Sequence, residues 1–179
     1  MNQVTVRGRR FIKSIGEKEI EERVSELATS LNRDLEGEDV LFLGILNGSF
    51  IFLADLYREI DLESDISFLK LSSYEGLTST GKIKELIGFD EMVEGRTVVV
   101  VEDIIDTGRT LNKIIEDLKK KGAGRVVIVT LLYKPEAYHG AHRIDYAGFE
   151  IPNDFVIGYG LDYDGLARNL RSIYRLAEE

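Results

Sequence analysis

Two adjacent carboxylates, Glu102 and Asp103, directly follow an apolar, β-branched run at residues 97–101. Such a run is typical of a central parallel strand that is covered on both faces. A buried strand cannot hide two adjacent carboxylates without partners, so we expect the strand to end near Glu102. Carboxylates at a strand end can accept hydrogen bonds from a sugar diol, or bind a Mg²⁺ ion that bridges a diol and a phosphate.

The loop after these acids has the composition of an anion site. It reads Asp106-Thr107-Gly108-Arg109-Thr110, which is small and hydroxylated, and it leads into a helical pattern. A strand, a tight loop and a helix N-terminus direct free backbone N–H groups and the helix dipole at one point. The loop therefore predicts a phosphate site, although an Asp-Thr-Gly triplet alone is also common in turns and helix caps.

The elements around this loop alternate between apolar runs and helical patterns. This alternation predicts an α/β fold: an open, mostly parallel twisted sheet with helices on both faces. The predicted strands are residues 40–45, 66–71, 97–101, 125–133, 146–151 and 155–159. The predicted helices are residues 15–35, 50–60 and 111–118. Ligands of such sheets bind beyond the carboxyl ends of the strands, and the polar clusters of this sequence stand there.

Local signals mark the borders of some elements. Ser14 and Glu17 have the spacing of a capping box, which predicts the start of the first helix. The polar, glycine-containing residues 72–81 are too irregular for a core element, and such a segment is usually a functional lid or a disordered insertion. The short C-terminal strands are expected to form a small cap over the edge of the sheet.

Composition and charge narrow the class of protein. A chain of 179 residues with 44% apolar and 31% charged residues is expected to form one globular domain. It has no cysteine and no apolar run that approaches the ~20 residues of a membrane span, so we expect a cytoplasmic protein without a membrane partner. A net charge of -9 argues against a broad nucleic-acid interface but leaves room for a local basic pocket.

The stretch Glu-Asp-Ile-Ile-Asp-Thr-Gly-Arg-Thr at residues 102–110 resembles the phosphoribosyl pyrophosphate motif of the type I phosphoribosyltransferases. Its flanks resemble the hypoxanthine-guanine branch of that family. Three more stretches resemble the same branch, in the same order: Leu46-Asn47-Gly48, Ser73-Tyr74 and GFEIPNDFVIGYGLDY at residues 148–163. The resemblance covers about residues 40–168. It implies the type I phosphoribosyltransferase fold, with a small cap from the N- and C-terminal segments.

This resemblance implies a Mg²⁺-dependent enzyme of purine salvage. Such an enzyme transfers the 5-phosphoribosyl group from phosphoribosyl pyrophosphate to hypoxanthine or guanine, and gives IMP or GMP and pyrophosphate. The resemblance also implies a homodimer or homotetramer, a mobile lid at about residues 72–85 that includes Ser73 and Tyr74, and a purine-covering cap at about residues 134–179.

The resemblance distributes the donor over several strand ends. Glu102 and Asp103 would hold the ribose hydroxyls and Mg²⁺, and Asp106 would exchange a proton with a purine ring nitrogen while also lining the donor site. The 5′-phosphate would be bound by Thr107, Gly108, Arg109 and Thr110. Pyrophosphate would be bound by Arg168 and by a loop with a non-proline cis peptide, Leu46, Asn47 and Gly48.

The purine would be bound by residues downstream of the phosphate loop. The resemblance implies that Lys134 donates to the six-oxo group, that Phe155 stacks on the base, and that Val156 bonds it through its backbone. Asp162 would lie at the same pocket and bind a second Mg²⁺. A lysine can donate to a carbonyl but cannot accept from an exocyclic amine, so six-oxopurines would be favoured over adenine.

Asn47 departs from the family, since many relatives carry a lysine there, and this puts a link from the loop to a subunit interface in doubt. Simpler readings exist for single residues: Lys134 could end a strand in solvent, Phe155 could be a core aromatic, and Asp162 could only cap a turn. The histidines, His139 and His142, are expected to lie exposed in a surface loop.

Three rival functions remain open at this point. The first is a regulator that binds RNA or DNA and uses the donor site as a sensor. The second is an enzyme of the same family with another base, such as xanthine. The third is an unrelated Mg²⁺-dependent phosphatase or receiver domain on a similar sheet, which would need an acid placed for phosphoryl attack.

Overall fold

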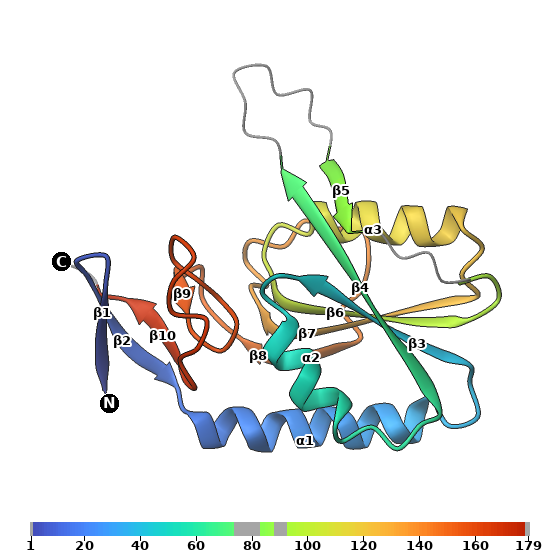
Figure 1. Ribbon diagram of the computed structural model, residues 1–179, viewed down its shortest axis with the longest axis horizontal. Helices are drawn as coiled ribbons and strands as arrows, with labels where there is room; N and C mark the ends of the chain where they lie inside the picture. The colour runs from blue at the N-terminus through green and yellow to red at the C-terminus, as the bar shows by residue number, and fades with distance from the viewer. Residues whose placement is uncertain (1, 74–82, 88–92, 178–179) are drawn as a thin grey trace.

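The computed structural model describes residues 2–73, 83–87 and 93–177 (Figure 1). Its main sheet has six strands in the order β5-β4-β3-β6-β7-β8. The five strands from β4 to β8 in that order pair in parallel, and β5 pairs with β4 in the antiparallel direction. The strands are β3 (Val40–Leu46), β4 (Ser64–Ser73), β5 (Ile83–Ile87), β6 (Thr97–Ile105), β7 (Arg125–Tyr133) and β8 (Tyr146–Glu150). No described helix is long and apolar enough to cross a membrane.

Helices cover both faces of this sheet in the described part of the chain, as Figure 1 shows. Helices α1 (Glu17–Asp34) and α2 (Phe50–Tyr57) pack on one face, and α3 (Arg109–Lys120) packs on the other. Because side chains alternate along a strand, Phe42 of β3 packs with α1 and α2, while Leu41 and Leu43 pack with α3. The expected α/β sheet with helices on both faces is therefore confirmed.

A second sheet forms the cap, in the order β1-β2-β10-β9, and all of its pairs are antiparallel. Its strands are β1 (Gln3–Val6), β2 (Arg9–Ile15), β9 (Val156–Ile157) and β10 (Ile173–Leu176). Arg7 and Gly8 join β1 to β2 with positive φ angles of 49° and 76°, as a type I′ hairpin turn requires. The cap therefore combines N- and C-terminal segments, as expected.

A side chain of α1 forms hydrogen bonds with the edge strand β8. Arg23 donates from Nε to the carbonyl oxygen of Gly148 at 2.8 Å, and from Nη2 to that of Ala147 at 2.8 Å. The open side of an edge strand is a template for pairing with another chain, and this arginine covers part of it by bonding to two carbonyl oxygens of β8. The contact also fixes α1 against the sheet.

The expected end of β6 was wrong. Residues Glu102 and Asp103 do not end the strand, which continues to Ile105 in register with β7. Backbone groups of a central strand need ladder partners whatever side chains they carry, and β7 supplies them as far as Tyr133. The polarity of the two acids is accommodated by a cavity at their side chains, described below.

The expected start of the first helix was also wrong in detail. Ser14 belongs to β2, and the helix begins at Glu17 after Gly16. The carboxylate of Glu19 accepts a hydrogen bond from the Gly16 backbone N–H at 2.8 Å, so a later acid takes the capping role. The helix ends as expected before Gly37, which has a φ of +78°.

Replacement of Leu118 by alanine should lower the free energy of unfolding by about 2 to 5 kcal/mol, because Leu118 is fully buried between α3 and the sheet. Urea unfolding measures this loss. Lys120→Ala on the exposed side of the same helix is the control, and it should change the free energy by less than about 0.5 kcal/mol. Equal effects of both changes would contradict this packing of α3.

Candidate active site

Two adjoining cavities lie at the carboxyl ends of β3 and β6, with volumes of about 340 and 130 Å³. Both are lined by Glu102, Ile104 and Thr110, so they form one continuous site. The larger one is also lined by Ile45, Leu46, Asn47, Gly48, Asp103, Asp162 and Arg168. The smaller one is also lined by Ile105, Asp106, Thr107, Gly108, Arg109 and Leu111. The structure thus brings together every residue that the resemblance assigns to the donor.

The loop between β3 and α2 has the backbone that the resemblance implies. The peptide bond between Leu46 and Asn47 is cis. A Cβ on Gly48 would lie 1.5 Å from the Asp103 carboxylate, so only glycine lets this loop lie directly against β6. Ser49, fully buried, donates its hydroxyl to the carbonyl oxygen of Ile45 at 2.6 Å and closes the turn.

Glu102 and Asp103 form a buried acidic pair. Burial raises the pKa of Glu102 well above its ordinary value, and the neighbouring charge of Asp103 raises it further. Burial also raises the pKa of Asp103, although the backbone N–H of Ile104, which donates to its carboxylate at 2.9 Å, and the charge of Arg168 oppose this. A cation or several hydroxyl donors at the pair would favour the ionised form.

The acidic pair suits Mg²⁺ only if other molecules complete the coordination. Within the described ranges, no group of three or more His, Cys, Asp or Glu residues could hold a metal ion. Mg²⁺ is usually bound through one or two carboxylates together with substrate phosphates and water. The two carboxylates of β6 therefore fit a Mg²⁺ ion that arrives with a phosphorylated ligand.

Asp162 and Arg168 form an ion pair at the wall of the larger cavity. The Arg168 Nη2 lies 2.6 Å from the Asp162 carboxylate, and its Nη1 donates to the carbonyl oxygen of Gly160 at 2.7 Å. The second carboxylate oxygen of Asp162 accepts the backbone N–H of Gly165 at 2.6 Å. Asp162 therefore does cap a turn, as the simpler reading suggested, but it also lines the cavity.

The phosphate loop runs into a helix as the sequence predicts. Gly108 has a φ of +79° and immediately precedes α3, whose first residue is Arg109. A Cβ on Gly108 would lie 2.5 Å from the ring of Tyr138, so the segment after β7 packs closely over the loop. The backbone N–H of His139 donates to the carbonyl oxygen of Thr107 at 3.4 Å. Backbone N–H groups at this helix start can bind an anion.

Lys134 lies between Asp106 and Asn153, and it contacts both. Its side chain is 8% exposed, and its Nζ lies 3.3 Å from the Asp106 carboxylate and 3.4 Å from the side-chain oxygen of Asn153. The solvated-strand-end reading of Lys134 is therefore wrong, because the ammonium is buried and paired. The carboxylate of Asp106 is about half exposed, which leaves it open to a ligand.

Phe155 is 47% exposed, so the reading as a core aromatic is wrong. Its ring is supported from behind by Tyr163, at 5.7 Å in an edge-on arrangement, and by Phe11, at 6.3 Å. Val156 is buried next to it in β9 and pairs with Arg175 of β10. The open ring can stack on a planar base.

Some site residues were missed by the sequence analysis. Asn153 stands two positions before Phe155 within the motif stretch, and Phe11 comes from the N-terminal hairpin, which had no assigned role. Both could have been suspected only from neighbours in space. Of the lid residues, Ser73 ends β4, while Tyr74 lies outside the described residues. His139 is exposed as expected, but His142 is only partly exposed.

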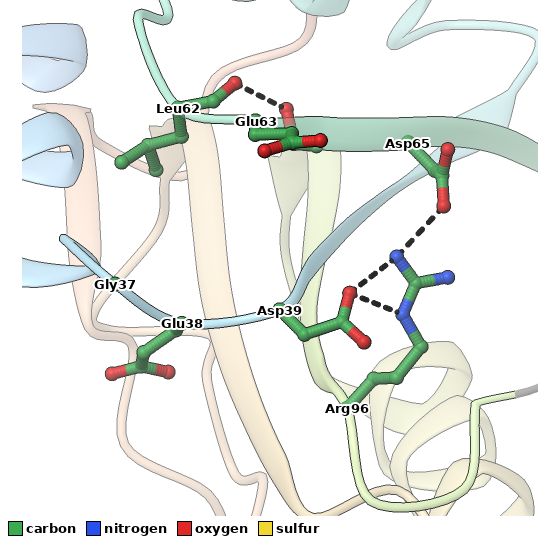
Figure 2. Close-up of a pocket in the computed structure, with 8 residues that line it drawn as sticks. Gly37, Glu38, Asp39, Leu62, Glu63, Asp65 and Arg96 are labelled. Carbon is green, nitrogen blue, oxygen red and sulfur yellow. Dashed lines mark hydrogen bonds and ion pairs between the residues drawn. The ribbon is translucent and has the colours of Figure 1, made fainter.

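A further hollow of about 520 Å³ lies at the opposite, amino ends of β3 and β4, as Figure 2 shows. Arg96 lies at its wall and bridges Asp39 and Asp65, with contacts of 2.8 Å to each carboxylate. The arginine is thus already neutralised by the chain itself. Because ligands of open parallel sheets bind at the carboxyl ends of strands, this hollow is not the candidate active site.

Comparison with known families gives the class of protein. Residues 12–164 match the model of the phosphoribosyl transferase domain. The matched range spans the main sheet, the acidic pair, the phosphate loop and Asp162. The chain belongs to the phosphoribosyltransferase family.

Within this family, the chain is similar to several individual proteins. The chain is 48% identical over 157 residues to a hypoxanthine-guanine phosphoribosyltransferase of Lactococcus lactis, which covers 87% of this chain and 85% of that protein. It is 42% identical over 166 residues to the bifunctional protein TilS/HprT of Listeria innocua, covering 92% of this chain and 26% of that longer protein. A crystal structure of a hypoxanthine phosphoribosyltransferase from Staphylococcus aureus superposes with a TM-score of 0.87 at 38% identity, over 92% of this chain and 90% of that one.

The buried acidic pair predicts an unusual pH dependence of stability. Because the pKa of Glu102 is raised above the 4.5 of an unperturbed glutamate, its stabilising contribution is present below about pH 4.5 and is lost as the pH rises through the folded-state value. Glu102→Gln should therefore raise Tm at neutral pH by a few degrees without ligand, as calorimetry can measure. The exposed Glu36→Gln is the control and should not change Tm. A lower Tm for Glu102→Gln would contradict the raised pKa.

Proposed function

We propose that this chain transfers the 5-phosphoribosyl group from phosphoribosyl pyrophosphate to hypoxanthine or guanine, giving IMP or GMP and pyrophosphate in purine salvage. The observation that supports this most is the continuous site around Glu102, Ile104 and Thr110. It joins an acidic pair that can bind a sugar diol to a loop at the start of a helix that can bind a phosphate. Lys134 and Phe155 add a carbonyl donor and an open aromatic face nearby. The relatives named above point to the same reaction.

The donor is proposed to lie across both cavities. Its 5′-phosphate binds the loop of Thr107, Gly108, Arg109 and Thr110, where backbone N–H groups and the start of α3 favour an anion. Its ribose hydroxyls donate to Glu102 and Asp103. Its pyrophosphate binds Arg168 and the backbone of the loop at Leu46, Asn47 and Gly48. The neutral Asn47 is compatible with this role, since the loop presents backbone groups.

The base is proposed to bind between Lys134 and Phe155. The Lys134 ammonium donates to the six-oxo group, and its present partners, Asp106 and Asn153, hold it in place. Phe155 stacks on the ring and Val156 bonds the base through its backbone. Asp106, which already contacts the ammonium, exchanges the proton of the attacking ring nitrogen.

Mg²⁺ is the proposed cofactor, held by Glu102 and Asp103 on the ribose side and by Asp162 on the pyrophosphate side. When bound, it neutralises charge on the leaving pyrophosphate. The chain's own part is to position the two substrates and to stabilise an oxocarbenium-like ribosyl centre. We further propose a cytoplasmic homodimer or homotetramer that acts as one domain, without nucleic-acid or membrane partners.

The proposal is tested by incubation of the protein with phosphoribosyl pyrophosphate, Mg²⁺ and one base at a time. Nucleotide should form from hypoxanthine and guanine, and adenine should give little, because Lys134 cannot accept from an amine. Chromatography measures the nucleotides. Product from xanthine alone would indicate another base for the same chemistry, and no product from any base would overturn the proposed function.

Asp106→Asn should lower turnover by about a hundredfold or more, because an amide cannot accept the ring proton, while the donor KM changes little. Steady-state kinetics with both substrates separate these effects. Asp117→Asn on the exposed face of α3 serves as the control and should leave both parameters unchanged. Unchanged turnover in Asp106→Asn would mean that another group moves the proton.

A further inference from the structure

Two segments that are distant in the sequence meet at the pyrophosphate end of the site. One is the loop at residues 46–49, which leads into α2, and the other is the segment after β9 that carries Asp162 and Arg168. One side-chain hydrogen bond joins them behind the cavity: the phenol of Tyr159 donates to the carboxylate of Asp55 in α2 at 2.6 Å. The proposed mechanism gives this bond no role.

Tyr159 is rigidly placed in its own segment. It is 7% exposed and belongs to the core that packs under α1 and α2. Its φ is +48°, which is uncommon for a non-glycine residue, and its backbone N–H donates to the carbonyl oxygen of Leu170 at 2.8 Å. Burial and the hydrogen bond to Asp55 both raise the pKa of Tyr159, so the phenol remains a donor at neutral pH.

The next residue connects Tyr159 to both pyrophosphate contacts. Gly160 has a φ of +100°, and a Cβ there would lie 2.1 Å from the carbonyl oxygen of Gly48. The backbone of Gly160 also exchanges two hydrogen bonds with Arg168: its N–H donates to the Arg168 carbonyl at 2.9 Å, and its carbonyl accepts from Nη1 at 2.7 Å. A shift of Tyr159 would therefore be passed to Gly48 and Arg168 at once.

We propose that Tyr159 and Asp55 are positioning residues for pyrophosphate binding, because their hydrogen bond sets the place of Arg168 relative to the loop at residues 46–49. This inference rests on the proposed function, which makes these two elements the pyrophosphate contacts. Neither Tyr159 nor Asp55 lines the two active-site cavities, so both act through other residues. Their loss should affect the pyrophosphate-bearing substrate and spare the base.

The surroundings of the bond make a clean experiment possible. On the side away from the active site, Tyr159 and Asp55 border a hollow of about 370 Å³ that also includes Ile51 and Arg58. Water in this hollow can reach the Asp55 carboxylate when the phenol hydroxyl is removed. Tyr159→Phe therefore keeps the ring in the core and leaves no unsolvated charge, so the variant should fold.

Tyr159→Phe should raise the KM for phosphoribosyl pyrophosphate by about fivefold to tenfold, because only part of the worth of the lost hydrogen bond is passed on to the pyrophosphate contacts. The KM for hypoxanthine should stay within about twofold, since Lys134 follows β7 and Phe155 precedes β9, both outside the segment from Tyr159 to Arg168. Asp55→Asn should behave nearly as the unchanged protein, because its amide oxygen can still accept from Tyr159. If Tyr159→Phe does not fold, Asp55→Ala removes the same bond from the α2 side and should give the same KM pattern.

A matched control is available in the same chain. Tyr146 donates to Asp34 at 2.8 Å, which is another tyrosine–aspartate bond, at the amino end of β8 and away from the site. Tyr146→Phe should change neither KM, although both phenylalanine variants should lower Tm. If a lower stability by itself raised a KM, the rise would therefore appear in both variants.

Two results would overturn the inference. One is an unchanged donor KM in Tyr159→Phe, and the other is an equal rise in the KM values for donor and base. The affinity for phosphoribosyl pyrophosphate with Mg²⁺ is also measured by calorimetry, which does not need turnover. Failure of the proposed function would show as no product from any base in the unchanged protein, whereas failure of this inference would show in the variants alone.

Discussion

The burial of two adjacent carboxylates in a continuing central strand is the constraint on which this site depends. Ionised carboxylates in a buried position are costly unless charge or hydrogen bonds compensate them. The surroundings of Glu102 and Asp103 supply part of that compensation through the Ile104 N–H and the charge of Arg168. The raised pKa values indicate that it is incomplete. The unbound site is therefore matched to a ligand that brings hydroxyl groups and a cation.

The features of the fold and the site that could be predicted from sequence are those whose signal lies within one short stretch of the chain. β-branched runs separated by helical patterns predicted the parallel sheet, because each signal is contained within one element. The phosphate loop was equally local, since Gly108 and the start of α3 are neighbours in the chain. The end of β6 was mispredicted because polarity was taken to break the strand. A ladder with β7 holds the backbone, and the cavity accommodates the side chains.

The parts that could not be predicted depend on contacts between distant segments. Nothing beside Lys134 in the sequence indicates that Asn153 completes its pairing, because the loop after β8 brings them together. Glu19 caps the first helix in place of the expected pair of Ser14 and Glu17, because Ser14 lies in β2. Family resemblance supplied the proposed roles of Lys134, Phe155 and Val156, which composition and periodicity could not assign.

The order of strands in the cap links both terminal segments of the described chain to one side of the candidate site. β2, from the N-terminal hairpin, pairs with β1 on one side and with β10 on the other, and Phe11 of β2 supports the ring of Phe155. The two active-site cavities are lined by residues between Ile45 and Arg168. The ring of Phe155 therefore depends on the pairing of β2 with β10, whereas neither strand contributes a residue to the lining of the two cavities. The aromatic part of the candidate site is thus tied to the antiparallel cap, and the acidic pair to the parallel sheet.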